Sequence, residues 1–405
     1  MQQVAEIAVP RPWIQEKLLM GLSLREYIRS LITPFNAAVG CILVVGLPVI
    51  AYRFLYGLGA ATNLSQTNPW GLWIGFDVLC GVALAAGGFT LATTVYLFGI
   101  KDYYPVLRPA VLTGFLGYFF VVVGLLVDLG RPYRIVYPVF YSFGVTSVMF
   151  EVAWCVFLYL TVLSIEFSPA LFEWLGWKIP RKWVVKMTIG LTVLGTILSM
   201  LHQSSLGALF LIAPTKLHPL YYTPFIPVYF FVTAVAAGLT MVIVESTLSE
   251  SIFHDQIHPE RPVDVERITL GLGRAAAVVL YTLFFMKLLS LADNFHFLGS
   301  PMGTWYLTEL FGFTVLPCFI FAFAVRAGNI NWVRVGAVLT VIGVVLSRLD
   351  VSIIAFNWNV PDRYFPSNME FMTTLTIVTL GVMTFRFIVN RMPVLYEHPE
   401  YGNAH

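Results

Sequence analysis

Apolar residues occur along this chain in runs of about 20 residues, separated by short polar segments. A helix of that length crosses the hydrocarbon core of a bilayer, and a helix satisfies its own backbone hydrogen bonds in lipid. The pattern therefore predicts an all-α polytopic membrane protein with about ten transmembrane helices. The predicted spans are 34–56, 70–98, 109–128, 143–165, 184–206, 224–247, 270–292, 304–326, 332–356 and 368–389. The first run is full length and begins after residue 33, so we expect no cleavable signal peptide.

Two of these spans contain closely similar stretches. Residues 191–204 and 339–352 are identical at eight of fourteen positions, which makes His202 equivalent to Asp350. Ala-Ala-Gly also occurs at both 85–87 and 236–238. Each pair lies four helices apart, so the partners run in the same direction through the membrane. We therefore predict two parallel four-helix bundles, helices 2–5 and helices 6–9, with helices 1 and 10 outside the repeat. The corresponding segments are 1–33 (a cytoplasmic amphipathic N-terminal segment), 34–66, 67–223, 224–360 and 361–405.

Lysine and arginine are distributed unequally between the two sides of the predicted bilayer. With the N-terminus inside, seventeen fall in inner segments and five in outer segments, while Lys287 and Arg348 lie within spans. Cytoplasmic loops of membrane proteins carry the excess of positive charge. We therefore expect both termini to be cytoplasmic, in a bacterial inner membrane.

Composition excludes some classes of function. Only 11% of the residues are charged, against roughly 25% in soluble domains, so membrane lipids are the expected surroundings. The net charge of +2 lacks the basic footprint of a nucleic-acid-binding protein. The four cysteines, Cys41, Cys80, Cys155 and Cys318, are far apart and form no CxxC pair, so we expect no iron–sulfur cluster and no metal in this chain.

The positions of the histidines argue against a haem cofactor as well. A membrane-embedded b-type haem is usually held by two histidines on facing helices. Of the seven histidines, His202 is the one placed convincingly within a predicted span. We therefore expect no haem, and a mobile redox carrier remains the candidate ligand.

Ionisable side chains within the predicted spans gather toward the outer side. Such side chains are costly in a membrane, and each is a functional candidate. The outer half holds Asp77, Glu151, His202, Glu309 and Asp350, whereas Glu245 is almost alone in the inner half. Salt bridges or snorkelling at helix ends are the alternative roles. The distribution predicts an outer polar cluster above a nearly dry inner half.

Five stretches resemble the NrfD/PsrC family of membrane subunits, in particular its ten-helix, HybB-like branch. They are residues 68–77 (NPWGLWIGFD), 128–132 (DLGRP), 201–207 (LHQSSLG), 216–221 (KLHPLY) and 364–370 (YFPSNME). The resemblance covers about residues 25–390. It implies a haem-free subunit that binds menaquinone or a related quinone near the outer, periplasmic face. It also implies a docked periplasmic ferredoxin-like iron–sulfur subunit, with a hydrogenase or multihaem cytochrome c subunits as further partners.

Quinone reduction needs two electrons and two protons, so it calls for titratable groups beside the quinone oxygens. A histidine has a pKa near neutrality, and a carboxyl group in a medium of low dielectric constant can also carry protons. The predicted quinone-binding residues are His202, Asp77, Trp70, Trp73, Arg131 and Tyr133. The predicted proton-transfer residues are Glu151, Asp77, Glu245, Glu309 and Asp350, with proton translocation as a further expectation.

Two rival functions remain open. A secondary transporter also has internal repeats and buried charges, but it binds its substrate near the midplane of the membrane. A passive membrane anchor would have no chemistry of its own. Neither rival predicts a bound quinone.

The ten-span topology makes a direct prediction. Reporter domains fused after Gly299 and after His405 should lie in opposite compartments, because three predicted spans separate the two sites. Alkaline phosphatase and green fluorescent protein activities would measure this, and the same compartment for both fusions would contradict the topology.

Overall fold

The computed structural model describes residues 12–253 and 264–396. The first eleven residues of the predicted N-terminal segment and the last nine of the predicted tail lie outside the described residues. Within the described ranges, ten helices or helix assemblies are long and apolar enough to cross a membrane. They occupy 34–56, 73–97, 101–128, 148–175, 178–211, 226–252, 265–299, 301–327, 330–354 and 368–389. The predicted fold class is confirmed.

Six of the spans contain one long helix or little more. These are α3 (Pro34–Tyr56), η3 with α7 (Lys101–Tyr103, Tyr104–Asp128), α9 (Val148–Leu175), α10 (Lys178–Leu211), α11 (Ile226–Ile252) and α16 (Asn368–Val389). The other four are assembled from pieces: η1, α5, α6 and η2 (Trp73–Cys80, Gly81–Leu84, Gly87–Ala92, Thr93–Leu97); α12 and η6 (Val265–Leu291, Ala292–Gly299); α13, η7 and α14 (Pro301–Leu310, Phe311–Val315, Leu316–Ala327); and α15 and η8 (Ile330–Leu349, Asp350–Ile354). Short helices outside the spans are α1 (Trp13–Lys17), α2 (Leu24–Ser30), α4 (Leu58–Ala61), η4 (Pro132–Arg134) and α8 (Tyr137–Phe140).

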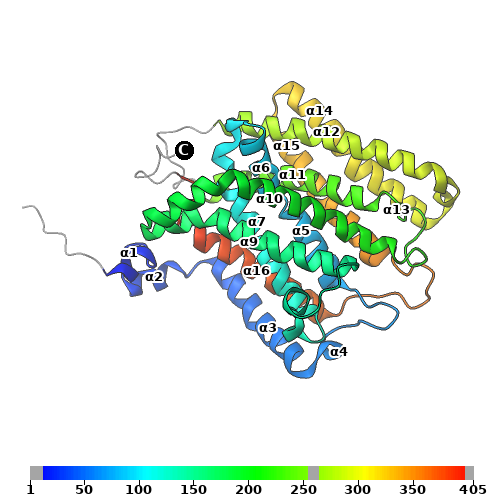
Figure 1. Cartoon of the computed structure of the whole chain (residues 1–405), viewed down its shortest axis with the longest axis horizontal. Coiled ribbons are helices and arrows are strands. Elements are labelled where there is room, and N and C mark those ends of the chain that lie inside the picture. Colours follow the sequence, from blue (N-terminus) through cyan, green and yellow to red (C-terminus); the bar gives the residue numbers. More distant parts are fainter. Residues whose placement is uncertain (1–11, 254–263, 397–405) are drawn as a thin grey trace, which may run out of the picture.

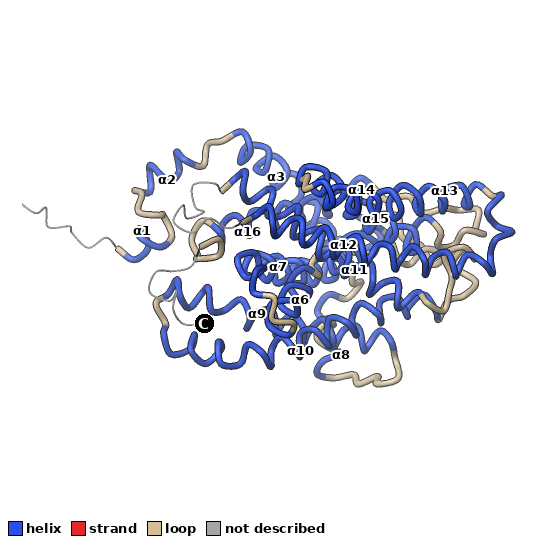
Figure 2. The backbone as a smooth tube through the Cα atoms, turned by 90° about the horizontal axis from the view of Figure 1, so that it is seen from above, coloured by secondary structure: helices blue, strands red, loops and turns tan. Residues whose placement is uncertain are grey.

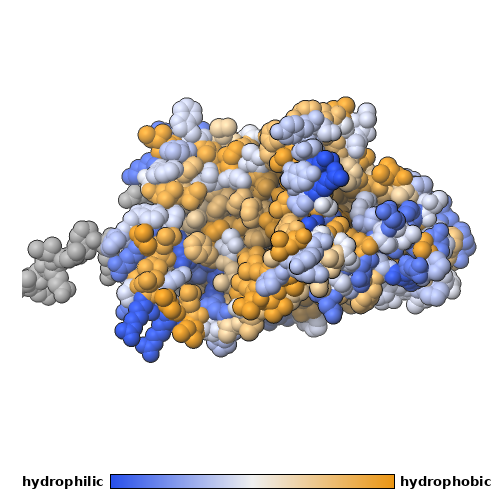
Figure 3. Space-filling model, turned by 90° about the horizontal axis from the view of Figure 1, so that it is seen from below, coloured by the Kyte–Doolittle hydropathy of each residue, from blue (hydrophilic) through white to orange (hydrophobic). Residues whose placement is uncertain are grey.

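The spans run roughly side by side between two ends of the molecule (Figure 1). One end carries α1, α2 and the chain that follows α16, and we call it the terminal face. The opposite end carries the connections that follow α3, α7, α10 and α15, and we call it the loop face. Side chains on the surface match this arrangement. In Figure 3 apolar side chains cover most of the middle of one face, and polar side chains gather toward its two ends.

The packing of the helices forms the two predicted bundles. In the first, α7 packs on η1, α6 and α9, and α10 closes the bundle against α9, α6 and η2. In the second, α11 packs on α12 and α15, and α14 joins those two helices. Helices α3 and α16 pack on each other and reach the first bundle through α7. Figure 2 shows α9 and α10 at one edge of the assembly and α13 and α14 at the other.

The two Ala-Ala-Gly motifs meet where the bundles join. A Cβ atom placed on Gly238 of α11 would lie 2.8 Å from the backbone of Ala86, and one on Gly87 would lie 3.3 Å from the Gly238 carbonyl oxygen. Ala86 and Ala237 are fully buried at the same contact. Small residues allow helix backbones to approach closely in membranes, where packing drives helix association. The repeated motif therefore sets the distance between the bundles.

The fourth span is longer than the sequence pattern predicts, and this corrects the picture of a dry inner half. α9 continues through Pro169 to Leu175 and ends at Gly176, whose φ of 76° suits glycine. Glu166 and Glu173 therefore lie within the span, on the side of the terminal face. The prediction was wrong because Glu166 interrupts the apolar run, while the helix itself continues to Leu175.

The close contact between bundles generates a stability prediction. Gly238→Val should lower the free energy of unfolding by about 1–3 kcal/mol, because its side chain meets backbone that cannot move freely. The matched control is Gly190→Val on α10, where an added Cβ has no heavy atom within 4 Å. Thermal unfolding of the purified protein in detergent would measure both, and equal losses would contradict the role of the contact.

Candidate functional site

Acidic side chains from three spans converge near the loop face. Asp77 lies in the π-helix η1, and its Oδ2 accepts a hydrogen bond of 2.9 Å from the Thr374 hydroxyl of α16. Gly124 of α7 lies directly against it, since a Cβ there would be 2.9 Å from the Asp77 Cβ. Asp128 at the end of α7 and Glu370 at the start of α16 complete the group. We call Asp77, Asp128, Glu370, Thr374 and the neighbouring Arg53 the loop-face cluster.

Arg53 of α3 supplies the positive charge in this cluster. It is almost fully buried, interacts electrostatically with Asp128, and donates a hydrogen bond through Nη2 to the Leu129 carbonyl oxygen. Its Nε and the Oδ1 of Asp128 have no hydrogen-bond partner among the described residues. Buried polar groups are nearly always satisfied, so these two atoms are available to a polar ligand or to ordered water.

Glu370 is held rigidly by the loops around it. Its carboxylate accepts hydrogen bonds from the backbone N–H groups of Asn63 (3.0 Å) and Ser367 (2.8 Å) and from the Tyr364 hydroxyl. Burial and the hydrogen bond to Glu370 raise the pKa of Tyr364, so this phenol keeps its proton at neutral pH. The indole N–H of Trp73 donates to the Glu370 carbonyl oxygen at 3.2 Å. This network therefore fixes the start of α16 beside Asp77.

His202 lies in a second group, deeper in the first bundle. Its ring is fully buried 5.5 Å from the ring of Tyr118, which packs edge-on against Tyr159 at 4.6 Å. Ser199 and Gln203 lie against the Tyr118 hydroxyl. We call these five residues the His202 cluster. Both ring nitrogens of His202 lack a hydrogen-bond partner among the described residues.

The two groups are close but separate. Gln203 donates a hydrogen bond of 3.0 Å to the carbonyl oxygen of Val82, five residues beyond Asp77 on the same span. Tyr118 and Gly124, which face His202 and Asp77 respectively, are six residues apart on α7. At 1.5 Å per residue the clusters are about 7–9 Å apart along the helices.

The other predicted quinone-binding residues are scattered. Trp70 packs on Phe356 and Phe210, with ring centroids 5.8 and 5.7 Å away. Arg131 and Tyr133 lie in the exposed segment after α7, and Tyr133 is 66% exposed. Trp73 touches the loop-face cluster through its bond to Glu370. The structure therefore brings Asp77 and Trp73 together but places Trp70, Arg131 and Tyr133 elsewhere.

The predicted proton-transfer residues also separate. Glu151 is on the exposed side of α9, where its Oε1 accepts a hydrogen bond of 2.6 Å from Ser205. Glu245 is buried on α11 against Thr113 of α7. In the second bundle, Lys287 and Glu309 form a buried ion pair of 2.7 Å, and Trp305 donates to Asp350 at 2.7 Å. The side chain of Glu309 also lies against Asp350, so the two belong to one polar group of the second bundle.

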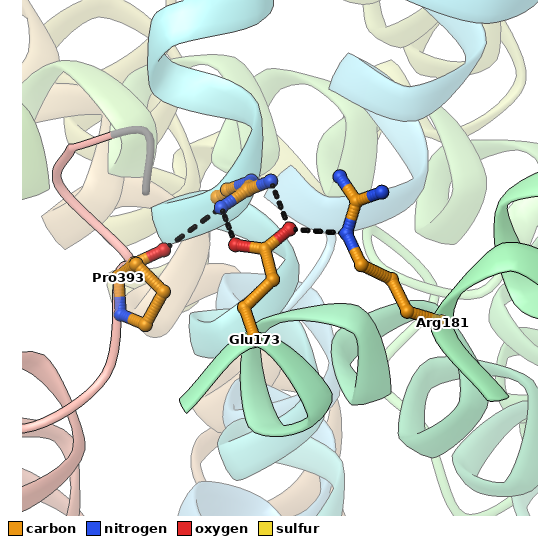
Figure 4. A network of polar contacts seen from close by, with 4 residues as sticks. Glu173, Arg181 and Pro393 are labelled. Carbon is orange, nitrogen blue, oxygen red and sulfur yellow. Dashed lines mark hydrogen bonds and ion pairs between the residues drawn. The ribbon is translucent and has the colours of Figure 1, made fainter. Parts of the chain in front are cut away.

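A buried ion network closes the terminal face of the first bundle. Glu173 lies between two guanidinium groups, those of Arg181 and Arg108 (Figure 4). Arg108 binds both carboxylate oxygens at 2.9 and 3.0 Å, and Arg181 Nε donates to Oε1 at 2.7 Å. Arg108 also donates to the Pro393 carbonyl oxygen at 3.0 Å. The chain after α16 is therefore tied to the first bundle.

Two histidines, His218 and His296, lie at the loop face, each beside Phe297. His218 is buried between Trp358 and Phe297, with ring centroids 4.8 and 5.5 Å away. Burial lowers its pKa, and Nδ1 accepts a hydrogen bond of 3.2 Å from the Leu220 N–H. The ring is therefore neutral at neutral pH and carries its proton on Nε2.

Sequence reasoning missed several polar residues that the fold places within the spans. Arg53, Thr374, Tyr118, Tyr159 and Glu166 received no role. Tyr118 and Tyr159 sit in apolar runs that carry no signal, but Glu166 followed by Glu173 at helical spacing is a usable signal of two acids on one face.

Comparisons with known proteins agree with this architecture. A family model described as "Polysulphide reductase, NrfD" matches residues 60–357. A protein of Nitratidesulfovibrio vulgaris (strain Hildenborough) is 50% identical over 93% of this chain and 98% of its own length. The "Probable Ni/Fe-hydrogenase 2 b-type cytochrome subunit" of Escherichia coli (strain K12) is 31% identical over 88% of this chain and 91% of its own length. The "Menaquinone reductase, integral membrane subunit" of N. vulgaris is 26% identical over 86% and 89%, respectively. Both the family match and the extent of these similarities show that the chain belongs to the NrfD family.

Proposed function

We propose that this chain is the membrane subunit of a respiratory redox complex and that it handles a quinone at its loop face. Relatives across nearly the whole chain are named as subunits of a hydrogenase and of a menaquinone reductase. The observation that carries the proposal is the loop-face cluster, in which three acidic residues and one arginine from four spans converge at the end of the molecule. Buried ionisable groups of this kind mark functional sites in membranes.

The loop-face cluster has the groups that a quinone head would need. Reduction of a bound quinone consumes two electrons, and two protons bind at the ring oxygens. Arg53 Nε is a buried donor without a partner, and it is suited to a ring oxygen. Asp77 is held by Thr374 through one carboxylate oxygen, so its other oxygen can carry a proton to the ligand. The hydrogen bond between Tyr364 and Glu370 holds the start of α16 beside η1 during this transfer.

His202 fits a relay position better than direct contact with the ligand. Its ring is fully enclosed with Tyr118 and Tyr159, about 7–9 Å along the helices from Asp77. A neutral imidazole can take a proton on one nitrogen and release one from the other. His202 would therefore return to Asp77 the proton that Asp77 gives up.

The described residues do not fit a bis-histidine haem, although one relative is named a b-type cytochrome subunit. His202 faces Tyr118, and His218 and His296 lie at the loop face with Phe297 between their rings. No group of three or more His, Cys, Asp or Glu side chains arranged to hold a metal occurs in ranges 12–253 and 264–396. We propose a haem-free and cluster-free subunit.

The excess of lysine and arginine near the terminal face favours a cytoplasmic position for that face and a periplasmic position for the loop face. A periplasmic iron–sulfur subunit would then dock on the loop face and supply or accept electrons. A hydrogenase or multihaem cytochrome would complete the complex.

Substitution of Asp77 tests this proposal in the purified complex. Asp77→Asn keeps the volume and the Thr374 contact but removes the titratable group, so quinone turnover should fall roughly a hundredfold. His202→Ala should also abolish quinone turnover. Electron transfer to an artificial acceptor at the partner subunit should be unchanged in both, because that acceptor bypasses the membrane step. The matched control is Asp293→Asn in the exposed segment η6, which should keep full activity.

Extraction of lipids from the same preparation gives an independent readout. Wild-type complex should contain quinone in stoichiometric amount. A secondary transporter or a passive anchor would contain none, and full quinone turnover in Asp77→Asn would place the site elsewhere.

A further inference from the structure

A cavity lies in the part of the first bundle nearest the terminal face, and none of the roles above uses it. Its volume is about 550 Å³, and all four spans of the bundle line it, through η2, α7, α9 and α10. Lys101, Arg108 and Arg181 lie toward the terminal face, and Glu166 of α9 lines it further into the bundle. A cavity with several polar groups is suited to hold water.

Glu166 of α9 lies against a stripe of polar side chains on α10. Thr192 donates a hydrogen bond of 3.3 Å to Glu166 Oε1. One turn further, Thr196 and Thr93 of η2 share a hydrogen bond of 2.7 Å. Thr188, Thr192, Thr196, Ser199 and Gln203 follow at spacings of three and four residues, so they lie on one face of the helix. From Thr188 to Gln203 this stripe spans about 22 Å, most of the roughly 30 Å of a bilayer core.

The stripe ends in the His202 cluster. Several buried polar atoms of that cluster have no hydrogen-bond partner among the described residues. They are the hydroxyls of Tyr159 and Ser199, Gln203 Oε1 and both His202 nitrogens. Ser199 lies next to both tyrosine hydroxyls. So many buried donors and acceptors in one place are characteristic of a site that binds ordered water.

The two arginine side chains at the mouth of the cavity are held in place by hydrogen bonds. Glu173 binds both Arg108 and Arg181, and the Pro393 carbonyl oxygen accepts a further hydrogen bond from Arg108 (Figure 4). Glu166 lies outside this network and accepts its hydrogen bond from Thr192. The network therefore keeps the cations at the rim and leaves the deeper carboxyl group facing the cavity.

We propose that this cavity is a water-filled proton entrance and that Glu166 is the carboxyl group that takes protons from it. Glu166 passes each proton along the α10 hydroxyls and ordered water to His202, which releases one toward Asp77. The inference rests on the proposed quinone chemistry and extends it: protons for the loop face come from the terminal face. Electrons enter at one face and protons at the other, so the reaction separates charge across the membrane.

A cysteine-accessibility experiment tests the entrance without any quinone chemistry. In a variant whose four native cysteines are replaced by serine or alanine, Thr188→Cys lines the cavity, and Thr240→Cys on α11 is fully buried. A membrane-impermeant thiol reagent applied from the terminal face should modify Thr188→Cys at least tenfold faster than Thr240→Cys. Equal, slow modification of both would overturn the water-filled entrance.

A transport experiment tests Glu166 itself. The complex is reconstituted in vesicles, and a pH-sensitive dye reports on the compartment at the terminal face. Wild type should take up protons from that compartment during quinone reduction. Glu166→Gln should lower this uptake at least tenfold and leave quinone content unchanged, and Glu166→Asp should restore part of it. The matched control is Glu250→Gln, a carboxylate in a half-exposed ion pair with Arg334, which should behave as wild type.

The outcomes separate the two proposals. Wild-type proton uptake in Glu166→Gln would overturn the role of Glu166 while leaving the quinone site intact. Quinone reduction by wild type with no uptake from the terminal face would overturn the pathway as a whole. Absence of quinone reduction in wild type would instead contradict the proposed function.

Discussion

The backbone contact between α11 and the second span sets the geometry on which the rest of the molecule depends. Gly238 and Ala86 leave no room for a side chain between them, so the backbones of α11 and the second span are in direct contact. Lipid offers no hydrophobic driving force between helices, and such packing has to supply the association energy. The second span also contacts α7, α10, α15 and α16, and it carries Asp77. Its position thus fixes the loop-face cluster relative to both bundles.

Much of the fold could be predicted because a bilayer allows few solutions. The length of the apolar runs gave ten spans, and the spacing of related motifs gave the two bundles. Helix ends were less predictable. Glu166 interrupts the apolar run of the fourth span, yet a carboxyl group can remain within a span when a hydroxyl such as that of Thr192 donates to it and a cavity lies beside it. A hydropathy pattern contains no information about that partner, which lies on another helix.

The candidate site was predictable in its residue types but not in its grouping. Asp77 and His202 both stood out as costly residues at similar depth. The sequence could not show that Thr374 of the last span meets Asp77 and that Arg53 of the first span faces Asp128. Nor could it show that two tyrosines from α7 and α9 enclose His202. Nor could it show that Glu309 is paired with Lys287. These groupings depend on helix rotation, which hydropathy does not determine in a span surrounded by protein.

The contact between the two Ala-Ala-Gly motifs has an evolutionary consequence. If the halves arose by duplication of one gene, a motif now touching its own copy was once a self-complementary patch on a smaller protein. Such a patch is what a symmetric dimer requires. The ancestor would then have been a homodimer of four-helix subunits, in which every substitution appeared twice. Fusion removed that restriction, so one half was free to keep His202 while the other acquired Asp350 and the ion pair of Lys287 with Glu309.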